Sequence, residues 1–305
     1  QKDSTLYEKS HPNVTIHIIM ENSPPSAYTK LNAELVSGSN VPDIMTIESY
    51  MAPSFLHRFP NSFLNVTGAV ASLKSKFAPV KWRDLTVNGQ VYGIPWDVGP
   101  SLVFYRRDLF SQAGINPADI QTWQQFIQAG QQLVHHFNGQ VKLTVWGSGS
   151  TGLYREMLYE QHTYWFNSRG QIAITSPASL AAVKVMREMY ADGLVQVVPY
   201  ASGWNDTIQA FVDNKIAAVP FGVWYVGTIE QSAPNQSGKW GVFPLPAFKA
   251  GGRHAGNLGG ANVVISGNTQ NLKTAISCAE FCITETDGLA QIIDNCLYLS
   301  ELPAY

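Results

Sequence analysis

Apolar side chains recur along the chain with a helical spacing in several segments. Between Ser26 and Ser37 they recur every three or four residues, and Gly38 follows directly, so we predict an amphipathic helix that ends there. A second helix is predicted over residues 123–137, with Thr122 as its N-cap. The other predicted helices span residues 153–161, 178–190, 207–214 and 273–282.

Runs of β-branched and other apolar residues predict buried strands between these helices. Asn88-Gly89 separates two short apolar runs and predicts a primed hairpin turn, because both of its central positions need positive φ. Strands and helices therefore alternate along most of the chain. The predicted strands span residues 14–20, 41–47, 101–105, 141–146, 239–246 and 263–265, and a further strand is predicted before Gly222, after the run at residues 214–219.

The most informative segment is GQVYGIPWDVGPSLVFYRRDLF, at residues 89–110. Pro95 excludes a helix here and favours a sheet edge or a crossing, so we expect Trp96 and Asp97 to be presented rather than packed. An indole beside a carboxylate at a strand end suits a sugar. The ring can cover the C–H face of a pyranose, and the carboxylate can accept hydrogen bonds from its hydroxyls.

This segment, followed by Gly114-Ile115 and Thr122-Trp123, resembles the signature of the extracellular solute-binding proteins of carbohydrate ABC importers, which are maltose-binding-protein-like. Two later stretches also resemble that family. Asp192-Gly193-Leu194 ends a long predicted helix, and Gly222-Val223-Trp224 follows a predicted strand. Asn214 stands where the family usually has glycine, and asparagine tolerates the left-handed backbone better than most residues.

The resemblance implies an α/β, two-lobed type II periplasmic-binding-protein fold with a hinge and an interlobe cleft. The lobes would comprise residues 1–104 with 247–305, and residues 105–246. The family's first strand would then precede Gln1, and its final helices would follow Tyr305. The implied function is the capture of a sugar or oligosaccharide and its delivery to a membrane permease, without catalysis and without a cofactor or a metal.

Candidate ligand-binding residues border polar or glycine-rich loops at predicted strand ends. Tryptophan and tyrosine faces would stack on sugar rings, while carboxylates, amides and the backbone N–H groups of two glycines would bind hydroxyls. The candidates are Glu48, Tyr50, Trp96, Asp97, Trp204, Asn205, Trp224, Tyr225, Gly259, Gly260 and Asn262. Trp82, Trp123 and Trp240 are expected in the core, and Trp146 and Trp165 are left undecided.

Composition narrows the choice of partners. Charged residues make up 14% of the 305 residues and the net charge is −2, which argues against nucleic acid and anionic membranes as partners. No apolar run reaches the roughly 20 residues of a membrane span, so no membrane insertion is expected. Aromatic residues make up 11%, which fits either large cores or stacking platforms. We expect a monomer that is periplasmic or extracellular, with or without a lipid anchor.

Two other motifs are weaker. The glycine-rich loop at residues 147–152 lies between a predicted strand and a helix, but it lacks the Lys-Ser/Thr ending of a phosphate loop. It is interpreted as a donor-rich wall or a plain connection. Cys278 and Cys282 have a spacing that would fit a metal pair, yet together with Cys296 they fit core cysteines or one local disulfide better. His135-His136 project to different helix faces and fit a solvated surface.

Two rival functions remain open from the sequence. A glycoside-active enzyme needs two facing carboxylates, and Glu48, Asp97 and Asp206 have no spacing that demands such use. A receptor for a phosphorylated polyol, such as a glycerol phosphoester, needs an arginine at the ligand. Arg106, Arg155 or Arg253 would have to fill that role. The sequence does not identify the sugar, its length or its linkage.

Overall fold

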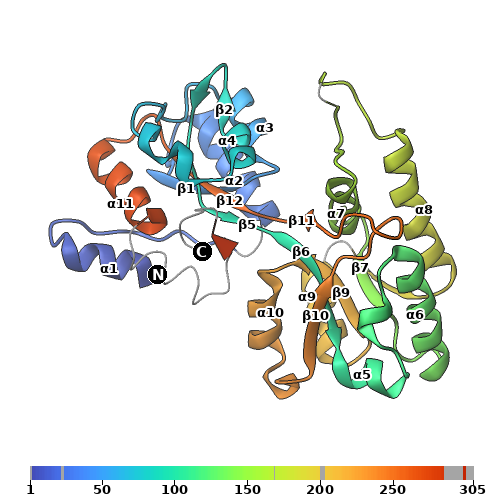
Figure 1. Ribbon diagram of the computed structural model, residues 1–305. Coiled ribbons are helices and arrows are strands. Elements are labelled where there is room, and N and C mark those ends of the chain that lie inside the picture. The colour runs from blue at the N-terminus through green and yellow to red at the C-terminus, as the bar shows by residue number, and fades with distance from the viewer. Residues whose placement is uncertain (1, 22–23, 168, 200–202, 285–297, 300–305) are drawn as a thin grey trace. The chain divides into compact units, whose positions relative to one another are not determined.

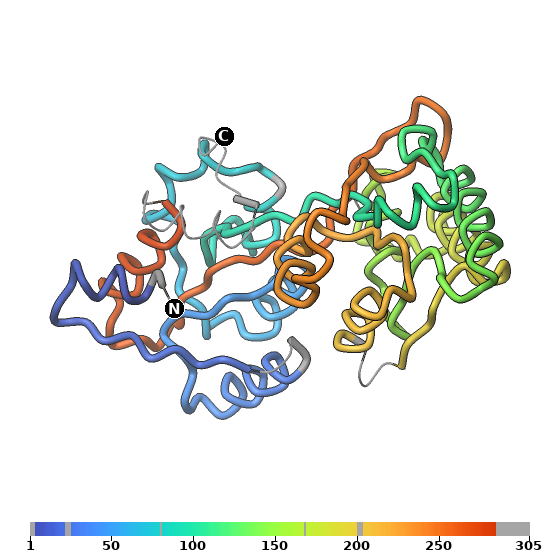
Figure 2. The backbone as a smooth tube through the Cα atoms, turned by 90° about the horizontal axis from the view of Figure 1, so that it is seen from below, coloured from blue at the N-terminus to red at the C-terminus, as the bar shows by residue number. Residues whose placement is uncertain are grey.

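The computed structural model describes residues 2–21, 24–167, 169–199, 203–284 and 298–299. The chain divides into two compact units: unit 1 comprises residues 1–98 and 259–305, and unit 2 comprises residues 99–258. Figure 2 traces the two places where the chain passes from one unit to the other. Both boundaries differ from the predicted ones, which lay at 104/105 and 246/247.

Unit 1 packs helices around a small antiparallel sheet (Figure 1). Its elements are α1 (Lys2–Ser10), α2 (Pro24–Ser37), β1 (Ile44–Glu48), α3 (Ala52–Arg58), η1 (Ala71–Lys76), α4 (Pro79–Asp84), β2 (Thr86–Val87), β3 (Gln90–Val91), β4 (Ile94–Pro95), β5 (Asp97–Val98), β12 (Ala261–Ile265), α11 (Leu272–Thr284) and β13 (Tyr298–Leu299). The sheet has the order β1-β12-β4, and β12 is antiparallel to both of its neighbours.

The pairing of β12 brings distant parts of the sequence together. Glu48, at the end of β1, lies opposite Ala261, and Pro95 lies opposite Asn262. Because β4 pairs on one side only within this sheet, Pro95 stands at a sheet edge, as its missing N–H requires. The carboxyl end of β1, the start of β12 and the segment around Trp96 therefore converge in unit 1.

The turn and helix end predicted in unit 1 are confirmed, because their residues have the positive φ values that these positions require. Asn88 and Gly89 have φ values of 50° and 78° and connect β2 to β3, as a primed turn requires. Gly38, directly after α2, has a φ of 67°. Ile47, Leu85 and other apolar side chains from the sheet and its helices form one buried core.

The strand predicted at residues 14–20 is wrong. These residues have no regular secondary structure, and Ile18, Ile19 and Met20 are 45%, 57% and 73% exposed. The described residues include no strand that is paired with this segment, so its apolar side chains have no sheet face to cover. The segment contacts α1 through a hydrogen bond from Ile16 N to the Glu8 carboxylate, at 2.7 Å.

Unit 2 is built around one long strand. Its elements are β6 (Pro100–Arg106), α5 (Arg107–Gln112), η2 (Pro117–Asp119), α6 (Trp123–His136), β7 (Thr144–Gly147), α7 (Gly152–Glu160), α8 (Pro177–Ala191), β8 (Val195–Val198), α9 (Gly203–Val212), β9 (Ala218–Gly222), α10 (Tyr225–Ser232), η3 (Pro234–Gln236), β10 (Trp240–Pro244) and β11 (Gly256–Asn257). β6 pairs antiparallel with β9, β10 and β11. This pairing explains the domain boundaries, because all of β6 and β11 belong to unit 2.

A parallel pair, β7 and β8, extends this sheet. A parallel bridge between Lys142 and Ile216 joins the start of β7 to the start of β9, and Ala218 N donates to Leu143 O at 2.7 Å. β7 and β9 therefore run in the same direction, and their carboxyl ends lie at the same edge. In α/β sheets that edge is where ligand sites form.

Two cores lie on opposite faces of the sheet of unit 2. Val103 packs with residues of α6, α7 and α8 in one core, and its neighbour Phe104 packs with residues of α9 and α10 in the other. Figure 1 shows these helices on the two sides of the strands. Thr122 caps α6 as expected, with a complete capping box. Asn214, after α9, has a φ of 57°, which confirms its glycine-like role.

Candidate functional site

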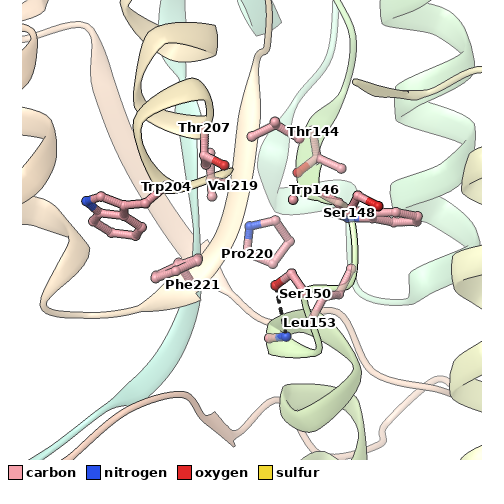
Figure 3. A pocket seen from close by; sticks show the side chains of 13 residues that line it. Thr144, Trp146, Ser148, Ser150, Leu153, Trp204, Thr207, Val219, Pro220 and Phe221 are labelled. Carbon is pink, nitrogen blue, oxygen red and sulfur yellow. Dashed lines mark hydrogen bonds between the residues drawn. The ribbon is translucent and has the colours of Figure 1, made fainter. Parts of the chain in front are cut away.

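A pocket of about 280 Å³ lies at the carboxyl ends of β7 and β9 in unit 2 (Figure 3). The loop after β7, the first turn of α7 and the start of α9 complete its walls. The residues that line it are Thr144, Val145, Trp146, Gly147, Ser148, Ser150, Gly152, Leu153, Trp204, Thr207, Val219, Pro220 and Phe221. The sequence left this loop as either a donor-rich wall or a plain connection, and the structure places it in the wall of the pocket.

Backbone contacts fix the loop that forms one wall. Ser148 N donates to Val198 O at 2.7 Å, and Ser150 N donates to Gly147 O at 2.9 Å. Gly149 has a φ of 76°, a conformation that side chains disfavour. The Ser150 hydroxyl accepts a hydrogen bond from Gly152 N at the start of α7, as the dashed line in Figure 3 shows. The loop thus presents hydroxyls on a fixed backbone.

Aromatic rings cluster at the opposite wall. The rings of Trp204 and Trp224 are stacked with centroids 6.0 Å apart, and the Phe221 ring lies 6.2 Å from Trp204 and 5.1 Å from Trp224. Trp204 is 46% exposed although it belongs to this cluster. A large indole that is fixed on one face and open on the other is suited to bind an apolar ligand face.

Gly222 explains how Trp224 is placed. A Cβ atom at Gly222 would lie 2.3 Å from the carbonyl oxygen of Leu258 and 2.6 Å from the indole nitrogen of Trp224. The same indole nitrogen donates a hydrogen bond to Leu258 O at 2.9 Å. Residue 222 must therefore be glycine for this arrangement, which gives the Gly-x-Trp pattern a physical reason.

The pocket combines apolar faces with neutral polar groups. Thr144 Oγ1 and Trp146 Nε1 are buried and have no hydrogen-bond partner among the described residues. Unpaired buried polar groups are unfavourable unless a ligand or water satisfies them. Of the described residues that line the pocket, none carries a charge. The site is therefore suited to a neutral ligand that has both hydroxyls and an apolar face.

A second cluster, in unit 1, is polar and charged. We call it the Lys81 cluster, and it comprises Glu48, Ser49, Lys81, Asp97, Ala261 and Asn262. Lys81 Nζ donates to Ser49 Oγ at 2.5 Å and to Ala261 O at 3.1 Å. Ala261 N donates to Asp97 Oδ1 at 2.6 Å. The cluster joins the end of β1, the start of β12 and β5.

Burial sets the electrostatics of the Lys81 cluster. Burial lowers the pKa of Lys81 to about 8, although the nearby carboxylates of Asp97 and Asp84 oppose this shift. Burial also raises the pKa of Asp97, against the Ala261 N–H and the Lys81 charge, which favour its ionised form. Tyr28 donates to Glu48 Oε2 at 3.1 Å, and burial followed by the Glu48 charge raises the pKa of Tyr28.

The predicted ligand-binding residues fall into two groups, one in each unit. Unit 1 holds Glu48, Tyr50, Trp96, Asp97, Gly259, Gly260 and Asn262, and unit 2 holds Trp204, Asn205, Trp224 and Tyr225. Tyr50 and Asn205 are exposed, and Glu48, Trp96 and Trp224 are half-buried. Gly259 and Gly260 have φ values of 103° and 88°, and Gly260 O accepts a hydrogen bond from Ser49 N at 2.8 Å.

Three of these residues are less accessible than predicted. Asp97 was expected to be presented, but it is 6% exposed because its carboxylate turns inward to Ala261 N. Asn262 is fully buried, and its amide donates to Ile47 O and Ser49 Oγ. Tyr225 is fully buried in the core with Phe211, so it presents no face to a ligand.

Sequence reasoning missed several residues that line the pocket of unit 2, and it missed Lys81 in unit 1. Trp146 was left undecided, although it ends a strand before a glycine loop, the setting that singled out Trp224. Ser148, Thr207 and Phe221 carried no individual signal. Lys81 was missed because an isolated lysine beside a core tryptophan is typical of a protein surface. Trp82 and Trp123 are buried, as predicted.

Two absences concern only the part of the chain that the structure describes. No group of three or more potential metal ligands occurs among those residues. None of their helices has the length and apolar character needed to cross a membrane. Cys278 is buried, and Cys282 packs against the core of unit 1. Cys296 lies outside the described residues.

The comparisons agree with this architecture. The lactose-binding protein of Rhizobium radiobacter is 35% identical over 262 residues, which are 84% of this chain and 60% of that protein. The arabinooligosaccharide-binding protein of Bacillus subtilis (strain 168) is 26% identical over 262 residues, 86% of this chain and 60% of that protein. The chain thus spans about 60% of the length of these two curated relatives.

A solved structure and a family model complete the comparison. The ABC transporter associated binding protein of B. animalis subsp. lactis Bl-04, in complex with beta-1,6-galactobiose, matches with a TM-score of 0.85 at 21% identity, over 98% of this chain and 73% of that one. It shows that the fold is the two-lobed α/β fold implied by the sequence. The model of the bacterial extracellular solute-binding protein family matches residues 1–287. The chain therefore belongs to the bacterial extracellular solute-binding proteins.

Proposed function

We propose that this chain captures a neutral sugar or oligosaccharide outside the cytoplasmic membrane and delivers it to the permease of an ABC importer. The relatives that are named for lactose and for arabinooligosaccharides support a carbohydrate ligand. The name of the similar structure supports the association with an ABC transporter. The protein acts in the periplasm or at the cell exterior, as a monomer.

The pocket in unit 2 is the observation that carries this proposal. Trp146, Trp204 and Phe221 supply apolar rings, and threonine and serine hydroxyls lie between them. A pyranose has one C–H face and a rim of hydroxyls, and this lining complements both.

We propose that the candidates in unit 1 also bind the sugar. Glu48, Tyr50 and Trp96 are the members of that group whose side chains are not buried, and they would bind hydroxyls and rings of the same sugar. We propose that the two units close about the two chain crossings when ligand binds both groups. A ligand can drive closure only if it binds the closed state more tightly.

We propose that the protein binds its sugar without cleaving it, and the position of the Asp97 carboxylate supports this. Asp97 is turned inward to Ala261 N, so it is not placed as a general acid for a bound sugar. Incubation of the protein with the bound sugar, followed by chromatography, tests this point. A binding protein returns the sugar intact, whereas a glycoside-active enzyme would release smaller products.

A phosphoester receptor is the weaker alternative. Arg106 is buried and pairs with Asp108 at 2.7 Å, and Arg253 contacts His162 at 2.8 Å. Neither of these guanidinium groups, nor that of Arg155, lines the pocket of unit 2. The phosphate of such a ligand would therefore lack a cation in that pocket, and burial of an unpaired charge is unfavourable.

The test is a thermal-shift and calorimetry screen. The panel contains neutral mono- and oligosaccharides, a uronic acid, a sugar phosphate and a glycerol phosphoester. We expect a neutral sugar to raise the melting temperature, because ligand that binds only the folded state stabilises it. A shift with phosphoesters and with no neutral sugar would overturn the proposal.

Variants locate the binding in the pocket. Trp204→Ala should weaken the binding of the best sugar by at least about tenfold, a loss of about 1.4 kcal/mol. Phe166→Ala is the matched control, since Phe166 is an exposed aromatic residue of unit 2 outside the pocket lining. It should bind as the unmodified protein does. Equal effects of both substitutions would remove the pocket from the proposal.

A further inference from the structure

Lys81 has a place that its sequence setting does not indicate. It lies in α4, is 4% exposed, and its ammonium group donates hydrogen bonds to two segments that are far apart in sequence. One is the residue after β1, Ser49, and the other is Ala261 at the start of β12. A buried lysine is uncommon unless its charge is paired and its hydrogen bonds are satisfied.

The two segments also hold each other. Ser49 N donates to Gly260 O at 2.8 Å, and Asn262 Nδ2 lies 3.3 Å from Ser49 Oγ. Lys81 donates to the same Ser49 hydroxyl, so it lies at the centre of this network. Four of the proposed ligand contacts are direct neighbours of the residues it fixes: Glu48 and Tyr50 flank Ser49, and Gly260 and Asn262 flank Ala261.

The charges around Lys81 come from three elements. Asp97 faces it from β5, Asp84 lies on its own helix, α4, and both carboxylates favour its charged form. Glu48, on β1, adds a negative charge that acts on Asp97. Lys81 therefore compensates buried negative charge at the place where β1, β5 and β12 converge.

We propose that Lys81 is a positioning residue for ligand binding, which fixes the loop after β1 against the start of β12 so that the candidate contacts of unit 1 keep their arrangement. This inference rests on the proposed function. Lys81 does not touch the ligand in this account. It acts through Ser49 and Ala261, and its charge favours the ionised form of the neighbouring Asp97 carboxylate.

Ligand affinity should depend on pH, because Lys81 loses its charge as the pH rises. The ammonium group is charged below a pKa of about 8 and neutral above it. As the pH rises through this value, Asp97 loses its compensating charge and the hydrogen bonds to Ser49 and Ala261 weaken. Ligand affinity should therefore fall between pH 6.5 and 9.5.

Two substitutions separate charge from packing. Lys81→Met keeps the length of the side chain and removes both charge and donors, whereas Lys81→Arg keeps a cation that does not titrate in this range. Lys74→Met, at an exposed lysine of the neighbouring η1, is the control for loss of one positive charge. Calorimetry at pH 6.5, 8 and 9.5 measures Kd for the sugar that gives the largest thermal shift.

We expect the affinity of the unmodified protein to fall by about tenfold over this range. Lys81→Met should bind weakly at every pH, Lys81→Arg should show a flat profile, and Lys74→Met should follow the unmodified protein. Wild-type affinity in Lys81→Met would overturn the proposal, and so would an equal decline with pH in that variant. A cooperative melting transition shows that each variant is folded.

A second measurement needs no ligand. Hydrogen exchange of the Ser49 and Ala261 amides should be at least about tenfold faster in Lys81→Met, while Thr46 and Val263, paired further along the same strands, stay unchanged. Unchanged exchange at Ser49 and Ala261 overturns the positioning role whatever the ligand is. Faster exchange in a protein that binds no sugar of the panel overturns the proposed function, and with it the role of Lys81 in binding.

Discussion

At the scale of single residues, a missing side chain at position 222 is as important as the rings around it. The indole of Trp224 and the carbonyl of Leu258 both lie closer to Gly222 than any Cβ atom allows. Trp224 in turn supports the exposed ring of Trp204 by stacking. One backbone position thus determines the geometry of the aromatic wall.

Gly222→Ala should therefore destabilise unit 2 and disturb the pocket. The added methyl group meets a backbone oxygen at 2.3 Å, so the backbone must shift, which typically costs about 1–3 kcal/mol. Urea unfolding measures the stability, and near-UV circular dichroism reports the tryptophan environment. Gly68→Ala is the control, because a Cβ atom there meets nothing within 4 Å. A variant at position 222 with unchanged stability would contradict this account.

The buried carboxyl group of Glu156 should make the stability of the protein depend on pH. It lies on α7, is fully buried, and has no hydrogen-bond donor in bonding geometry at either carboxyl oxygen among the described residues. Burial raises the pKa of Glu156 from 4.5 to about 8, and the nearby Ser101 hydroxyl and Arg155 charge offset the rise only in part. The folded protein therefore keeps a proton that the unfolded chain releases between these pH values.

It follows that the free energy of unfolding falls as the pH rises from 5 to 8, by at most about 1.4 kcal/mol per pH unit from this one group. In Glu156→Gln this contribution disappears, while the smaller one from Glu160, whose pKa burial raises to about 7, remains. Urea unfolding at pH 5, 6, 7 and 8 measures both slopes. Glu230→Gln, at an exposed carboxylate of unit 2, should keep the original slope. An equal slope in Glu156→Gln would refute the assignment.

Single residues also show which features of the candidate site could be predicted from the sequence. Trp204 and Trp224 were predicted because each borders a loop, and the structure places their rings in one cluster. Asp97 and Tyr225 follow the same local rule, yet their burial depends on contacts with residues that are distant in sequence. Lys81 depends entirely on such contacts, so no local pattern could indicate it.

At the scale of elements, α6 shows how local signals define a boundary. The Thr122 hydroxyl accepts a hydrogen bond from Gln125 N, and the Gln125 side chain accepts one from Thr122 N at 3.0 Å. Directly after the cap, Trp123 and Phe126 enter the core of unit 2. The start of this helix could be predicted from sequence because its signals lie within a few residues.

Thr122→Ala should cost about 1 kcal/mol of stability, because the first turn of α6 loses the side chain that accepts its N–H. Thr122→Ser keeps the hydroxyl and should stay within a few tenths of a kcal/mol of the original protein. Urea unfolding of both variants in parallel provides the comparison. If alanine and serine behave alike, the capping box does not stabilise this helix.

Strands are harder to predict because they need a partner. Residues 14–20 have strong β-forming character, yet Ile18 and Ile19 are exposed and the segment is not a strand. Pro100–Arg106 has a similar composition and forms the central strand of unit 2, because β9 and β10 pair with its two edges. Composition alone does not distinguish the two cases.

At the scale of the whole molecule, the resemblance predicted two lobes, and the chain does divide into two compact units. Their boundaries could not be predicted, because they depend on which unit pairs with β6. The ends of unit 2 are joined by backbone contacts: Leu258 N donates to Gly99 O at 2.7 Å, and Gly99 N donates to the Asn257 side chain at 3.1 Å. Unit 2 is thus one continuous piece of chain with neighbouring ends.

We therefore expect residues 99–258 to fold when they are expressed alone. The fragment keeps both of its cores and every strand that pairs with β6, so it should unfold in one cooperative transition and retain the circular dichroism of packed tryptophans.

The fragment 105–246, cut at the boundaries predicted from sequence, is the matched control. It loses residues 100–104 of β6, including Val103 and Phe104, which are buried in the two cores. It should stay unfolded or aggregate, since β9 and β10 would lose their shared neighbour. Cooperative folding of both fragments would show that β6 is dispensable, and failure of 99–258 would show that unit 2 depends on unit 1.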